Sequence, residues 1–149
     1  MYYTNKETFV LSADGCMDTE RGGLESILAG NDEGAKGCCF SVAMSADGIA
    51  VLSSDGCAAA PDGTRLPVSD YSYAELHQAA PQLTPVSQAI ELARTCQGKI
   101  AITVHDQTML RQLRMTLRYA DCLDDTIIIG LGLVFLLMIL MYNVLGLVA

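Results

Sequence analysis

Residues 38–55 read Cys-Cys-Phe-Ser-Val-Ala-Met-Ser-Ala-Asp-Gly-Ile-Ala-Val-Leu-Ser-Ser-Asp. The dipeptide Asp47-Gly48 lies between two apolar runs, which is a common signal for a tight turn between antiparallel strands. The sequence therefore predicts a β-hairpin with strands at 38–44 and 49–53.

Outside the hairpin, apolar patterns of strand and helix type alternate along the chain. The expected elements are strand 8–12, helix 23–33, helix 85–96, strand 99–105 and helix 107–119, and a strand at 126–129 is one of two alternatives for the segment after them. Between the hairpin and about residue 82 we expect an irregular insertion. The alternation favours an α/β fold with parallel pairing everywhere except in the hairpin. A chain of 149 residues is too short for a complete eight-unit barrel of about 250 residues.

The hairpin resembles the metal-site segment of the glycerophosphodiester phosphodiesterases, where Glu-Leu-Asp-Val precedes Thr-x-Asp-Gly and a strand that ends in His-Asp. Gly34-Ala35-Lys36-Gly37 is similar to the end of the family's first helix. Residues 84–93, which begin Thr-Pro-Val-Ser, are similar to its Pro-Thr-Leu-Glu-Glu helix. The order and spacing of these segments extend the resemblance over roughly residues 8–130. It implies a partial (half) TIM-type barrel with a β-hairpin extension.

The same resemblance implies a catalytic site whose residues this chain does not carry. The family uses a His at the first strand end, two carboxylates that hold Ca²⁺ or Mg²⁺, and a second His that transfers protons. The corresponding positions here are Ala13, Cys39, Ser41 and Ser54. None of these side chains is a good ligand for a hard cation, so we expect no cofactor and no metal ligand. Without the ion and the proton shuttle, phosphodiester hydrolysis loses its main sources of transition-state stabilisation.

Three polar residues remain as candidates to contact a ligand. Asp14 follows the first expected strand, Asp55 matches the Asp of the family's His-Asp pair, and His105 ends the strand at 99–105. Asp14 and Asp55 both follow strand ends, on the side where barrel proteins build their sites. The alternative is a structural role in turns, which is common for Asp after a strand.

The C-terminal residues 126–149 contain no charged side chain. A helix of that length rises about 35 Å, enough to cross a hydrocarbon core of about 30 Å. We therefore expect an α/β domain over 1–125 and a single-pass transmembrane helix over 126–149. Arginines at 111, 114 and 118 precede this segment and no basic residue follows it, which favours a cytoplasmic soluble part. The alternative is a barrel strand at 126–129 followed by a core helix.

Composition limits the partners. The net charge is −8 and only nine Lys and Arg residues are present, so nucleic acid is not an expected ligand. The six cysteines lack Cys-x-x-Cys spacing and nearby His pairs, which is typical of small apolar residues in a reducing compartment. An open half-barrel leaves a sheet edge unpaired, so we expect a homo-oligomer or a partner chain. The membrane is the other expected partner.

These observations favour a membrane-anchored, catalytically inactive phosphodiesterase-like protein that acts by binding or assembly. The alternative is a divergent metal-dependent phosphodiesterase that hydrolyses glycerophosphodiesters in lipid metabolism. A third interpretation is a truncated gene product whose apolar end arose incidentally.

Overall fold

The computed structural model describes residues 10–96, 98–106 and 108–130. Its main sheet contains four parallel strands in the order β1-β2-β6-β7, with β3 paired to the end of β2. These strands are β1 (Ser12–Ala13), β2 (Gly37–Met44), β3 (Ala50–Leu52), β6 (Lys99–Val104) and β7 (Thr126–Gly130). Only the β2-β3 pair is antiparallel. The expected α/β fold and the expected hairpin are therefore confirmed.

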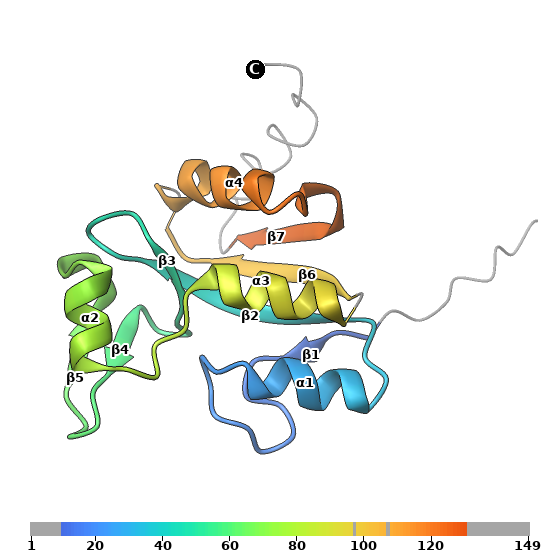
Figure 1. Ribbon diagram of the computed structural model, residues 1–149, viewed down its shortest axis with the longest axis horizontal. Helices are drawn as coiled ribbons and strands as arrows, with labels where there is room; N and C mark the ends of the chain where they lie inside the picture. Colours follow the sequence, from blue (N-terminus) through green and yellow to red (C-terminus); the bar gives the residue numbers. More distant parts are fainter. Residues whose placement is uncertain (1–9, 97, 107, 131–149) are drawn as a thin grey trace, which may run out of the picture.

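Three helices connect successive parallel strands and cover one face of the sheet (Figure 1). They are α1 (Glu25–Asp32), α3 (Val86–Thr95) and α4 (Met109–Tyr119). Their apolar sides bury Phe40 of β2 and Ile102 of β6 in one cluster with Ile90 and Leu113. Strands that alternate with helices in this way form the repeating unit of a TIM-type barrel, and four such strands make half of one.

Within the described part of the chain, no helix covers the opposite face of the sheet. Side chains alternate along a strand, so Phe40 and Val42 join the helix-covered core while Cys39 and Ser41 point away from it. Cys39 Sγ lies 4.0 Å from Thr103 Oγ1 of β6 on this second face. We call it the inner face and define it by the strand register as Ala13, Cys39, Ser41, Ala101, Thr103, Ile127 and Ile129.

The segment between β3 and α3 folds into a small accessory unit beside the sheet (Figure 1). Its elements are β4 (Cys57–Ala59), β5 (Arg65–Pro67), a 3-10 helix (Val68–Asp70) and α2 (Tyr73–Ala79). Val68, Leu76 and Leu83 form its core with Val51 of β3. The expectation of an irregular insertion is wrong, because a hairpin and a capped helix bury enough apolar surface to order this segment.

Residues 126–130 belong to the sheet. Thr126–Gly130 forms β7, which pairs in parallel with β6 over its whole length. The expected start of a transmembrane helix at 126, and the domain end at 125, are therefore wrong, and the alternative strand at 126–129 is confirmed. The rest of the expected span, 131–149, lies outside the described residues. Among the helices of the described ranges, none is long and apolar enough to cross a bilayer.

Candidate functional site

Three of the four family positions share one face of β1 and β2, and the fourth follows the end of β3. Ala13 and Cys39 are register partners on β1 and β2, and Ser41 lies on the same face of β2 two residues further on. Ser53 N donates to Ser41 O at 3.0 Å, which brings the end of β3, followed by Ser54, to this place. Residues that are far apart in the sequence are thus neighbours here. The side chains are a methyl group, a thiol and two hydroxyls, and none of them is a carboxylate or an imidazole.

A cavity of about 520 Å³ opens at the carboxyl ends of β2 and β6. Ser54 and Asp55 line it from the end of β3, and His105 and Asp106 line it from the end of β6. The structure thus brings together two of the three expected ligand-contacting residues, Asp55 and His105. Cavities of this volume hold small molecules, and the side on which it opens is where barrel proteins build their sites.

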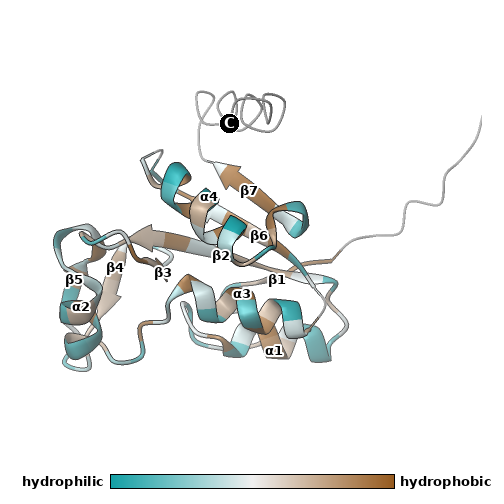
Figure 2. Cartoon of the chain, turned by 45° about the horizontal axis from the view of Figure 1, so that its top comes forward, coloured by the Kyte–Doolittle hydropathy of each residue, from teal (hydrophilic) through white to brown (hydrophobic). Residues whose placement is uncertain are grey.

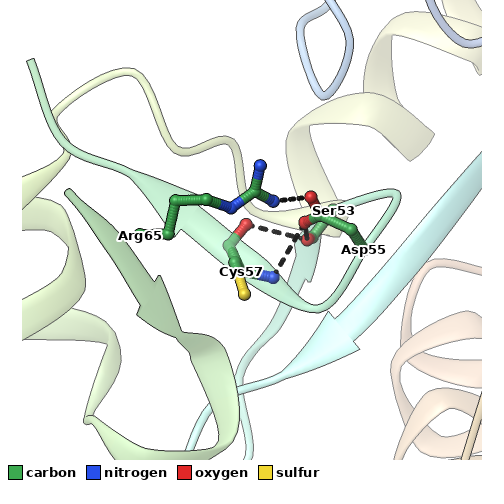
Figure 3. A network of polar contacts seen from close by, with 4 residues as sticks. All are labelled: Ser53, Asp55, Cys57 and Arg65. Atoms are coloured by element: carbon green, nitrogen blue, oxygen red, sulfur yellow. Dashed lines mark hydrogen bonds and ion pairs between the residues drawn. The ribbon is translucent and has the colours of Figure 1, made fainter. Parts of the chain in front are cut away.

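Asp55 is engaged in a local network (Figure 3). Its Oδ1 accepts hydrogen bonds from Cys57 N at 3.0 Å and from Ser53 Oγ at 3.4 Å. Its Oδ2 forms an ion pair with Arg65 of β5. The Asp55 carboxylate thereby fixes the turn into β4 and joins the two strands of the accessory hairpin. Both side chains of the ion pair are about half exposed, so the pair itself adds little stability.

Asp14 has a different environment. Its Oδ1 accepts a hydrogen bond from Gly22 N at 2.8 Å, which closes the loop between β1 and α1. Asp14 lines neither the 520 Å³ cavity nor a neighbouring cavity of about 390 Å³ that contains Arg21, Asp55 and Arg65. The structure therefore does not place Asp14 in a cavity with the other two candidates.

Asp47 and Asp106 also lie near the cavity, and each holds a chain turn. Asp47 Oδ1 accepts from Ser45 Oγ at 2.6 Å and from Tyr73 N at 2.9 Å, so it ties the β2-β3 turn to α2. The Ser45 hydroxyl, followed by the Tyr73 N–H, lowers the pKa of the Asp47 carboxyl below its ordinary value. Asp106 Oδ1 accepts from Thr108 N at 2.9 Å just before α4 begins.

This donor set does not fit the Ca²⁺ or Mg²⁺ of the phosphodiesterase family. A hard cation prefers about six oxygen ligands, with carboxylates among them. Ala13 and Cys39 supply no oxygen side chain, and the Asp55 carboxylate at the cavity is already paired with Arg65. Within the described ranges there is no group of three or more His, Cys, Asp or Glu residues that could hold a metal ion.

Cys38, the neighbour of Cys39 on β2, is a buried thiol. Cys38 points into the helix-covered core. Burial raises the pKa of the Cys38 thiol to about 12, and the neighbouring Cys39 and Cys96 add to the increase. Burial also raises the pKa of Cys122. The Cys38 thiol is therefore neutral near pH 7, in keeping with the sequence interpretation of the cysteines as small apolar residues.

Several solved structures resemble this chain. A glycerophosphodiester phosphodiesterase from Thermotoga maritima matches 96% of this chain and 61% of its own, with a TM-score of 0.75 at 19% identity. One from Agrobacterium tumefaciens strain C58 matches 94% of this chain and 64% of its own, with a TM-score of 0.76 at 13% identity. A phosphodiesterase from Oleispira antarctica, solved with the product sn-glycerol-3-phosphate, matches 93% and 63%, with a TM-score of 0.76 at 15% identity.

The chain therefore has a glycerophosphodiester phosphodiesterase-like fold, and the resemblance found in its sequence is confirmed at the level of the fold. It spans less than two thirds of the length of these neighbours. No family model matches the sequence, and no curated protein matches it. Identities as low as these establish the fold and leave the activity to be argued from the site.

The sequence did not indicate Arg65, the residue that forms an ion pair with the Asp55 carboxylate. A signal for it exists, because Asp62-Gly63 is a turn dipeptide. Asp62 Oδ1 accepts from Thr64 N at 2.8 Å, and this turn sends β5 back along β4 towards Asp55. The flanking residues include three alanines and two prolines and few large or β-branched side chains, so the turn alone did not indicate a hairpin.

Proposed function

We propose that this protein is a phosphodiesterase-like binding protein that does not hydrolyse phosphodiesters by metal-dependent chemistry. The observation that supports the proposal most is the side-chain chemistry on the inner face where β1 pairs with β2. Ala13, Cys39 and Ser41 share one face there, in a place where a cation would need several oxygen ligands.

The expected loss of rate is large. A positioned acid or base contributes about 10²–10⁴-fold to an enzymatic rate, and both His positions of the family, Ala13 and Ser54, lack a group that transfers protons. A bound cation contributes several kcal/mol of further transition-state stabilisation. The side chains at the site replace neither contribution at neutral pH, so hydrolysis above the uncatalysed level is not expected.

The cavity remains suitable for binding a small phosphate ester. It offers the Ser54 hydroxyl and the exposed His105 imidazole as hydrogen-bond donors, and both group types bind phosphate oxygens in proteins. The Oleispira antarctica neighbour was solved with sn-glycerol-3-phosphate. The ligand class that we propose here is accordingly an ester of glycerol phosphate.

Hydrolysis is tested with the full chain in mild detergent, glycerophosphocholine as substrate, and Ca²⁺ or Mg²⁺. We expect glycerol 3-phosphate release at the rate of the protein-free blank. Metal-dependent release that Asp55→Ala abolishes and Asp62→Ala leaves intact would show an active enzyme and overturn the proposal. Asp62 is the matched control, because it is an exposed Asp that also closes a turn.

Binding is tested by titrating sn-glycerol-3-phosphate and following the ring signals of the two histidines by NMR. We expect the His105 signals to shift and to saturate while those of His77 do not move, since His77 stacks on Tyr73 in α2. His105→Ala should weaken binding measured by calorimetry, and His77→Ala should not. If no ligand binds at millimolar concentration, the binding part of the proposal fails.

We also propose that residues 131–149 anchor the protein in a membrane with the folded part in the cytoplasm. This segment contains no charged residue, and a helix over it would rise about 28 Å, close to the roughly 30 Å of a hydrocarbon core. Arg111 and Arg118 precede it, and basic residues on that side favour this orientation. Carbonate washing of membranes should leave the chain in the pellet, whereas its release into the wash would refute the anchor.

A further inference from the structure

The β7 side of the inner face exposes apolar side chains, whereas Ala101 at the centre of this face is buried. Ile128 of β7 packs against the helix-covered core, whereas its neighbours Ile127 and Ile129 are 54% and 41% exposed on the inner face. Figure 2 shows β7 in the brown of apolar residues. In a closed barrel, the residues at such positions fill the interior.

The sheet also has two unpaired edges among its described strands. β1 and β7 are the ends of the strand order, and both run in the same direction. On the side facing β2, Lys36 N donates to Val10 O at 2.8 Å and Asp14 N donates to Cys39 O at 3.0 Å. The chain at 10–13 is thus extended, and its other side is a free edge, whose N–H and C=O groups are available to pair with another strand.

We propose that a second copy of this chain covers the inner face and pairs with both edges, so that two half-barrels form one eight-stranded barrel. In a two-fold arrangement about an axis parallel to the strands, β7 of each copy lies beside β1 of the other. Both new pairs are parallel, as in a TIM-type barrel. Eight strands give an interior that side chains can just fill. The same interface is used twice, which is the common geometry of a homodimer.

The sizes of the inner-face side chains support this occupant. The β1 and β2 side of the face presents small groups, Ala13, Cys39 and Ser41, while the β7 side presents Ile127 and Ile129. Two-fold closure sets the two isoleucines of each copy against the small groups of the other. The second copy therefore places large side chains beside the small side chains of the first copy. A barrel interior requires close packing of this kind.

Closure would also complete the candidate site. All strands of such a dimer have their carboxyl ends on the same side, so the two cavities that contain Asp55 and His105 open around one shared mouth. Gly130, at the carboxyl end of β7, lies on that side in both copies. The inference does not depend on the proposed function, because neither ligand binding nor a membrane anchor is needed for the interface.

The first test measures the protein mass of the full chain in detergent by light scattering with the detergent contribution subtracted. We expect about 32 kDa, twice the 15.9 kDa of one chain. Ile127→Asp should give the mass of one chain, because it buries a charge in the closed interior. Met115→Asp is the matched control: Met115 is 52% exposed on α4, away from the inner face, and this variant should remain dimeric.

The second test follows alkylation of Cys39, which lies on the inner face, with Cys16 of the loop after β1 as the internal reference. In the dimer Cys39 should react slowly, and dilution of the parent protein below the dissociation constant should accelerate its reaction several-fold while Cys16 stays unchanged. This readout needs no variant to fold. A parent mass of one chain, or a dimer in which neither dilution nor Ile127→Asp changes the Cys39 rate, overturns the proposal. A one-chain mass with a protected Cys39 also overturns it and shows that the same chain covers its inner face.

Discussion

The contact between α1 and β1 gives a sharp test of how the site strand is positioned. Gly30 of α1 is buried against Ser12 of β1, and a Cβ added at Gly30 would lie 2.1 Å from Ser12 Cβ and 2.5 Å from Ser12 Oγ. Gly30→Ala gains up to about 1 kcal/mol of helix propensity. It also introduces an overlap, and overpacking typically costs about 1–3 kcal/mol. The Ser12 Cβ is bonded to the strand backbone and cannot rotate away, so the upper part of that range applies. We expect a net loss of about 2 kcal/mol.

Thermal unfolding of the full chain, followed by circular dichroism in one detergent and at one protein concentration, measures this loss. A destabilisation of about 2 kcal/mol should lower Tm by about 4–8 °C for a protein of this size. The matched control combines Gly30→Ala with Ser12→Gly. The nearest remaining atom at position 12 is then Cα, at 3.5 Å from the new Cβ, which is an ordinary contact. Gly30→Ala should therefore be stabilising or neutral in the Ser12→Gly background.

Two outcomes would refute this reasoning. One is a Gly30→Ala protein with the Tm of the parent. The other is an equal decrease in Tm in the parent and in the Ser12→Gly background, because a direct overlap requires the two substitutions to couple by about 1 kcal/mol or more. Either result would mean that α1 and β1 are further apart than the structure shows, and the place of Ala13 on the inner face would lose its support.

Two further predictions concern ionisable groups. Burial raises the pKa of Cys38 to about 12, so iodoacetamide at about pH 8 should leave Cys38 unmodified in the folded protein and modify it in urea. Peptide mass spectrometry measures the modification in both states. Rapid modification of Cys38 in the folded protein would contradict its place in the core. The Ser45 hydroxyl and the Tyr73 N–H lower the pKa of Asp47 in the folded protein. The Asp47 carboxylate therefore stabilises the fold at pH values above its unfolded-state pKa of about 3.9, and this contribution is lost as the pH falls through its folded-state pKa. Asp47→Asn should consequently reduce the decrease in Tm between about pH 5 and pH 3, and an unchanged decrease would show that the carboxylate contributes nothing.

The elements of the main sheet could be predicted because each one has a local signature. In α4 the residues Met109, Leu110, Leu113 and Leu117 recur at helical spacing, and all four are buried. The Asp47-Gly48 turn predicted the β2-β3 hairpin, and Gly48 adopts a φ of 82°, a value that favours glycine. Periodicity and turn chemistry are short-range properties, so a single sequence is enough to recognise them.

The accessory unit and β7 could not be assigned with the same clarity, for different reasons. The accessory unit has short strands without a long apolar period, and its clearest local signal is the capping box of Ser72 and Glu75 at the start of α2. β7 begins an uncharged segment, and an apolar run of that kind fits a strand or a membrane helix equally well. What makes Thr126–Gly130 a strand is its pairing with Ile100–Val104 of β6, which is a tertiary contact.

The candidate site, too, could be predicted only in part from the sequence. Its positions could be predicted, because Ala13, Cys39 and Ser41 follow from strand order and register. Its contacts could not, because the ion pair of Asp55 with Arg65 depends on how the β4-β5 hairpin folds back. Whether a carboxylate is available to a ligand is decided by such contacts, and the sequence shows only that the carboxylate exists.

The alternation of side chains along β2 explains how one fold can present such different chemistry at the site. Cys38, Phe40 and Val42 hold the helices, while Cys39 and Ser41 face the other way, so the inner face can change without disturbing the helix-covered core. Two carboxylates at these inner-face positions would need a cation or water around them, because burying unpaired charge is costly. A thiol and a hydroxyl carry no such requirement. The residues that offer no carboxylate ligand to a hard cation are therefore the same residues that would allow the proposed second copy to close over the inner face.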